Sequence, residues 1–94
     1  MVEKYKDCIN MGIGYMSSEE YDKAIKKFEE ALEYDSQDAE VYIHLGNAYA
    51  NKEEYNQAIA YFKKALVIKK DDGEILFNIG NIYFLKDEYA DAVK

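Results

Sequence analysis

The chain has 94 residues, enough for one domain, and its 49% hydrophobic and 33% charged residues are typical of a folded globular protein rather than a disordered one. The formal net charge is −7, and all twelve basic residues are lysines. This charge argues against nucleic-acid binding and against docking on anionic membranes, because both draw their affinity from cationic contacts. The absence of arginine removes the usual two-point grip on carboxylates and phosphates.

Apolar residues recur at steps of three and four along the whole chain, the period of amphipathic helices. Polar turns separate the segments, and Ser17 with Glu20 fits a capping box that would start the second helix. The helices predicted in chain order cover about residues 4–16, 20–34, 39–51, 54–69 and 74–86, with a sixth beginning near Asp87 or Glu88. The fifth helix carries the apolar series Leu76, Ile79, Gly80, Tyr83 and Phe84.

The sequence also bears on the compartment. Cys8 is the only cysteine, so no disulfide can form within the chain. The first ten residues, MVEKYKDCIN, mix acids and lysines where a signal peptide would be apolar. No apolar run approaches the roughly 20 residues that span a bilayer. We therefore expect a cytoplasmic protein.

The chain repeats itself at a step of 34 residues. The glycines 12, 46 and 80 follow this step, as do the tyrosines 15, 49 and 83. Tyrosine and alanine recur in the second half of each unit, and Phe28 matches Phe62. A fixed period of this length indicates an array of helix pairs, each of which buries its apolar face against its neighbours. The repeats span about residues 5–38, 39–72 and 73–94, and the third is incomplete.

This pattern resembles the tetratricopeptide repeat, a helix–turn–helix unit of 34 residues. The middle repeat carries the family's signature at these positions: Tyr42, Leu45, Gly46, Tyr49, Tyr55, Ala58, Phe62 and Ala65. The resemblance implies an all-α fold, a right-handed superhelical solenoid of antiparallel helix pairs that forms a single domain over residues 1–94. Glu19, Glu53 and Asp87 stand where the family usually has a turn glycine.

The resemblance also implies a concave groove, lined by the first helix of each repeat, that binds a peptide or partner protein. Asn47 and Asn81 lie one repeat apart and are expected to pair with a ligand's backbone, although asparagine is common there in such repeats. The groove residues that the family's positions identify are Ile9, Ile13, Ile43, Asn47, Asn51, Phe77, Asn81 and Phe84.

One subclass of the family grips the acidic C-terminus of heat-shock chaperones with lysines and asparagines. The matching positions here are Ile9, Ile13, Asn47, Phe77 and Asn81, and only Asn47 fits. Without a cation at these positions, recognition of a terminal carboxylate is not expected.

The sequence shows no catalytic constellation, and we expect neither an enzyme nor a cofactor or metal site. The lone His44 has no ligand set at metal-binding spacing, and we expect it at the surface or at the edge of the groove. Cys8 falls at a packing position and is expected to be a small buried hydrophobe. The run Gly12-Ile13-Gly14 lacks the third glycine and the preceding strand of a dinucleotide site.

These features favour a non-catalytic protein-interaction module whose partner is a peptide or protein. Two alternatives stay open: the repeats are the scaffold or regulatory arm of a larger enzyme or regulator, or they form a self-assembling scaffold. Because the third repeat has no counterpart of Phe62, Ala65 and Leu66, we expect its apolar surface to be uncovered. Homo-association through this incomplete C-terminal repeat is therefore expected.

Overall fold

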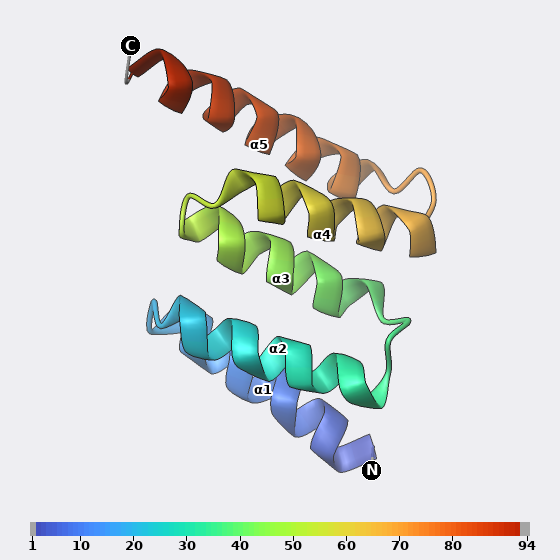
Figure 1. Cartoon of the computed structure of the whole chain (residues 1–94). Helices are drawn as coiled ribbons and strands as arrows, with labels where there is room; N and C mark the ends of the chain where they lie inside the picture. Colours follow the sequence, from blue (N-terminus) through green and yellow to red (C-terminus); the bar gives the residue numbers. More distant parts are fainter. Residues whose placement is uncertain (1, 93–94) are drawn as a thin grey trace.

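The computed structural model describes the backbone of residues 2–92 and the side chains of residues 4–87. The described backbone contains helices and turns and no strand, which confirms the all-α fold. The helices are α1 (Val2–Ser17), α2 (Tyr21–Tyr34), α3 (Ala39–Asn51), α4 (Tyr55–Ile68) and α5 (Gly73–Ala92). Figure 1 shows consecutive helices running in opposite directions and stacked so that the chain begins and ends at opposite ends of the array.

Each of the two complete repeats contains a glycine that lies under an aromatic ring. A Cβ atom added to Gly12 would lie 2.5–2.8 Å from ring atoms of Phe28, and one added to Gly46 would lie 2.8–2.9 Å from Phe62. Both rings are almost fully buried, at 0% and 1% exposure. The missing side chain therefore lets α1 approach α2, and α3 approach α4, closely enough to bury the ring between them.

Two hydrophobic clusters form the core, one in each complete repeat. The first surrounds Phe28 and includes Val41, Leu45 and Ala48 from the next repeat. The second surrounds Phe62 and includes Ile75 and Ile82 of α5. Because each cluster uses a helix of the following repeat, neighbouring repeats stabilise one another, as expected for a solenoid.

Polar contacts join the first repeat to the second. The Tyr5 hydroxyl donates to the Asp38 carboxylate, which also accepts from the Glu40 N–H at 2.9 Å and caps α3. Lys52, after α3, pairs with Asp22 of α2 at 2.5 Å. These contacts are exposed or half-buried, so they orient the repeats more than they stabilise them.

The turns that end α1 and α3 adopt the same conformation. Glu19 and Glu53 have φ values of 61° and 63°, the left-handed region that usually takes glycine. The N–H of Glu20 donates to the carbonyl of Tyr15 at 2.8 Å, and Glu19 donates to Met16 at 3.0 Å, which is the Schellman pattern. The predicted capping box is wrong: Ser17 ends α1, and α2 begins without a side-chain cap.

The predicted break near Asp87 and the sixth helix are also wrong, because α5 continues to Ala92 as a single helix. Asp87 is the equivalent of Glu19 and Glu53, so a turn there would place it in the left-handed region at a cost of about 1–2 kcal/mol. In the first two repeats the packing of a second helix offsets this cost. Continuing α5 avoids the cost and keeps the backbone N–H groups paired. The side chains of Tyr89, Ala92 and Val93 lie outside the described residues.

Only part of the apolar surface of α5 is buried. Ile75 and Ile82 are buried and Ile79 is half-buried, all against the second cluster. Leu76, Gly80, Tyr83 and Phe84 of the same apolar series are exposed. The same positions in α3 pack against α4, whereas the described part of α5 packs only on the preceding repeat.

None of the described helices has the length and apolarity needed to cross a bilayer.

Candidate functional site

The first helices of the three repeats carry the predicted groove residues in one register. Ile9 and Ile13 of α1, Asn47 of α3, and Asn81 of α5 occupy positions related by 34 residues or by one helical turn. Residues four apart lie on one face of a helix, and residues one repeat apart occupy equivalent places in the stack. We call this shared surface the groove face.

Six of the eight predicted groove residues are exposed, and two are not free. The exposed ones are Ile13, Asn47, Asn51, Phe77, Asn81 and Phe84. Ile9 is half-buried against the first cluster. Ile43 is only 8% exposed and lies in the second cluster with Ile75 and Ile82. Ile43 therefore belongs to the core of the second repeat and offers little surface to a ligand, a burial that repeat position alone does not indicate.

The groove face carries apolar and amide side chains, and none of the eight predicted residues is charged. Phe77 and Phe84 are 67% and 62% exposed, unusually high for phenylalanine. Three asparagines supply both donors and acceptors, which match the amide groups of a peptide backbone. A surface of this kind recognises apolar side chains and main chain rather than a carboxylate or phosphate.

His44, which was predicted at the surface or at the groove edge, packs between two repeats. It is half-buried and stacks on Phe28 of α2, with ring centroids 5.1 Å apart and planes at 12°. Burial lowers the pKa of His44 and outweighs the opposite effect of the carboxylates of Glu40 and Asp38. The imidazole is thus a packing element of the α2–α3 junction.

Cys8 is 6% exposed, which confirms its predicted packing role. Burial raises the pKa of its thiol, and the nearby charge of Glu30 adds to this effect. The thiol is therefore protonated and unreactive at neutral pH. Among the residues whose side chains are described, no three histidines, cysteines or carboxylates are grouped to hold a metal.

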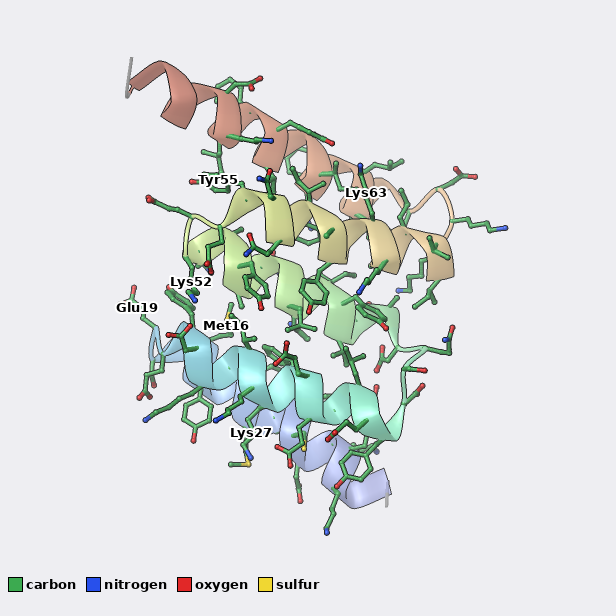
Figure 2. All side chains as sticks on the ribbon, in the orientation of Figure 1. Met16, Glu19, Lys27, Lys52, Tyr55 and Lys63 are labelled. Carbon is green, nitrogen blue, oxygen red and sulfur yellow. The ribbon has the colours of Figure 1, made fainter. Side chains whose placement is uncertain are left out.

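A cleft of about 360 Å³ lies beside the turn between α1 and α2 and was not predicted from the sequence. Its lining comprises Glu19, Glu20, Tyr21, Asp22, Lys23 and Lys52. Figure 2 shows Lys52 and Glu19 on the same side of the stack, where α1 and α3 end. Lys23 pairs with Glu20 at 3.1 Å and Lys52 with Asp22, so both lysines of the lining are engaged in contacts within the chain. The cleft is a junction between repeats.

Comparison with known protein families now identifies the class. A family model described as TPR repeat matches residues 14–53 and 46–87, most of the chain. The chain therefore belongs to the tetratricopeptide repeat family, as the glycine–phenylalanine packing of its helix pairs indicates. No curated protein shows a significant match to the sequence.

Solved structures confirm the fold. The TPR2B domain of yeast Sti1, in a complex with pHsp70, is 22% identical with a TM-score of 0.84, over 96% of this chain and 72% of that one. The Yersinia enterocolitica type III secretion chaperone SycD, with a peptide of the translocator YopD, is 21% identical with a TM-score of 0.82, over 93% and 66%. MamA AMB-1 is 25% identical with a TM-score of 0.79, over 94% of this chain and 48% of MamA.

Proposed function

We propose that this chain is a non-catalytic protein-interaction module that binds a peptide or a segment of a partner protein along its groove face. The observation that carries the proposal is the exposure of Phe77, Phe84 and repeat-related asparagines on the first helices of the array. The complexes of Sti1 and SycD support it, because two relatives of this fold are described with pHsp70 and with a YopD peptide.

The proposed ligand is a peptide with apolar side chains and an accessible backbone. Ile13 at one end of the face and the phenylalanines of α5 at the other would take the apolar side chains. Asn47 and Asn81 would pair with main-chain amides between them. The net charge of −7 favours encounter with neutral or cationic peptides and disfavours strongly acidic ones.

The test uses peptides selected from a display library on the immobilised chain. Affinity of a selected peptide is then measured by titration for the wild type and for the double variant Asn47→Ala, Asn81→Ala. Since a net hydrogen bond contributes about 0.5–1.5 kcal/mol, we expect the affinity to fall about 5- to 150-fold. The matched control is Asn10→Ala, Asn56→Ala, which removes two exposed asparagines outside the groove positions.

The control variant should bind like the wild type, and all three proteins should have the same helical circular dichroism. Equal affinity of wild type and the Asn47, Asn81 variant would reject the groove face and place the site elsewhere, for example on the convex face.

We further propose homo-association through α5, which would make the chain a self-assembling scaffold. The exposed apolar side chains of α5 favour this: Leu76, Phe77, Tyr83, Phe84 and Leu85 are 41–67% exposed. So many large apolar side chains on one helix are characteristic of an interaction surface. A role as the arm of a larger protein is compatible with both proposals, since the chain spans less than half of MamA.

A further inference from the structure

The two complete repeats share one contact that α5 lacks. In each of them a glycine of the first helix receives the phenylalanine of the second helix: Gly12 lies under Phe28, and Gly46 under Phe62. The two helices run antiparallel (Figure 1). The second helix also carries an alanine four residues before its phenylalanine, at Ala24 and Ala58, and both are fully buried.

Helix α5 presents both halves of this contact on one exposed face. Gly80 is the repeat equivalent of Gly12 and Gly46, and a Cβ atom placed on it would meet nothing within 4 Å. Four residues later comes Phe84, 62% exposed. Gly80 and Phe84 therefore have the same four-residue separation as the alanine and phenylalanine of the second helices. Gly80 also has the place of the first-helix glycine that receives a phenylalanine ring.

We propose that α5 is a self-complementary interface and that its occupant is α5 of a second copy, packed antiparallel about a two-fold axis. With the axis at the level of Ile82, Gly80 of each copy lies opposite Phe84 of the other. The contact that closes the first two repeats is then made twice, as a two-fold interface requires. This inference rests on the proposed homo-association and specifies its surface and register.

The neighbouring side chains suit this arrangement. Leu76 and Tyr83 are 48% and 43% exposed and flank Gly80, so pairing would cover them too. Their equivalents in α3, Tyr42 and Tyr49, are half-buried by α4. The pairing therefore extends to α5 the packing that already covers this face of α3.

Electrostatics predicts how the association depends on salt. Each copy carries a net charge of −7, so the two copies repel one another, while the face around Gly80 is mainly apolar. Salt screens repulsion between exposed charges and leaves apolar packing intact. The proposed dimer should therefore become tighter as the salt concentration rises, whereas a dimer held by ion pairs would become weaker.

The first experiment measures mass by sedimentation equilibrium over a concentration series. The wild type should pass from monomer to dimer. Phe84→Ser should raise the dimer dissociation constant about tenfold or more, because two rings lose their burial per dimer. The control Val67→Ser removes another apolar side chain, 73% exposed on α4, and should leave the constant unchanged.

A second pair of variants blocks the contact without removing apolar area. Gly80→Gln fills the position opposite the ring and should weaken the dimer. Gly14→Gln adds the same side chain to α1, where it also meets nothing within 4 Å, and should not. Both changes replace a helical glycine with a better helix former, so neither is expected to unfold the chain.

Cysteine crosslinking tests the register. Gly80→Cys and Phe84→Cys chains are mixed under oxidised glutathione, with the buried Cys8 left in place. The antiparallel arrangement should give mainly the mixed disulfide between positions 80 and 84. A parallel arrangement would instead give 80–80 and 84–84 disulfides and would overturn the inference.

The outcomes separate the two proposals. A wild type that remains monomeric at millimolar concentration rejects homo-association and this interface together. A dimer that Phe84→Ser and Gly80→Gln leave unchanged keeps homo-association and rejects α5 pairing. A dimer that both variants weaken, with the mixed disulfide, supports the α5 pair.

Discussion

At the scale of single residues, the fold depends on glycines, which leave room for a neighbouring ring, as well as on the apolar side chains of the core. Phe62 fills the space left by Gly46 so completely that a single methyl group would lie 2.8 Å from the ring. Gly80 occupies the same place in its helix but has open space around it. Adding a side chain at these two equivalent glycines should therefore change the free energy of unfolding in opposite directions.

Gly46→Ala should lower the midpoint of urea unfolding. The added methyl overpacks a ring that is 1% exposed, at a cost of about 1–3 kcal/mol, whereas alanine gains about 0.5–1 kcal/mol over glycine in a helix. The net effect is a loss of stability. Gly80→Ala is the matched control, and because only the helical gain applies there, its midpoint should rise. Midpoints that move in the same direction would contradict the packing described here.

Much of this packing could be predicted from the sequence, because the 34-residue step places glycine, alanine and phenylalanine at contacts that recur in each complete repeat. His44 could not be placed in the same way. Its stack on Phe28 joins two repeats, and a contact between repeats depends on how far one helix pair is rotated against the next. Ile43 was placed in the groove for the same reason, although it is buried in the second cluster.

At the scale of elements, the turns after α1 and α3 each hold one residue in an unfavourable backbone conformation. Glu19 and Glu53 complete the Schellman hydrogen bonds, yet each holds a left-handed backbone conformation that disfavours residues with a Cβ atom. The family's usual glycine is absent at both positions. The sequence identified these positions as departures from the family pattern, and the structure explains why glycine is preferred there.

Glu53→Gly should therefore stabilise the chain. Relief of the left-handed strain should raise the free energy of unfolding by about 1–2 kcal/mol. The extra conformational freedom of glycine in the unfolded chain should lower it by about 0.5–1 kcal/mol. We expect a net gain of about 0.5–1 kcal/mol in urea unfolding. Glu29→Gly, in the middle of α2, is the control and should lose about 1 kcal/mol. No gain at position 53 would show that the turn relaxes by another route.

In helix α5 the spacing of apolar residues does not predict which face is buried. Its apolar residues surround the helix, with Ile75 and Ile82 on one side and Leu76, Phe77 and Phe84 on others. The sequence predicts a helix but does not determine which side is covered, since that depends on which helices are present to pack against it. The end of α5 was misplaced for the same reason.

At the scale of the whole molecule, the array is elongated, with extents of 48 × 30 × 17 Å. Figure 1 places α5 at one end of the stack, away from α1 and α2. The groove face and the proposed dimer interface meet on this helix, and both use Phe84. A ring covered by a second copy is not available to a peptide, so the two proposed activities should compete.

Peptide affinity should therefore fall as the protein concentration rises. At a total concentration ten times the dimer dissociation constant, about one fifth of the chains are monomeric, and the apparent affinity for the selected peptide should be roughly fivefold weaker. Titrations at high and low protein concentration measure this difference. Gly80→Gln keeps Phe84 and Asn81 in place but blocks pairing, so its affinity should not depend on concentration. A wild type that dimerises and still binds the peptide equally well at both concentrations would show that the ligand does not use Phe84.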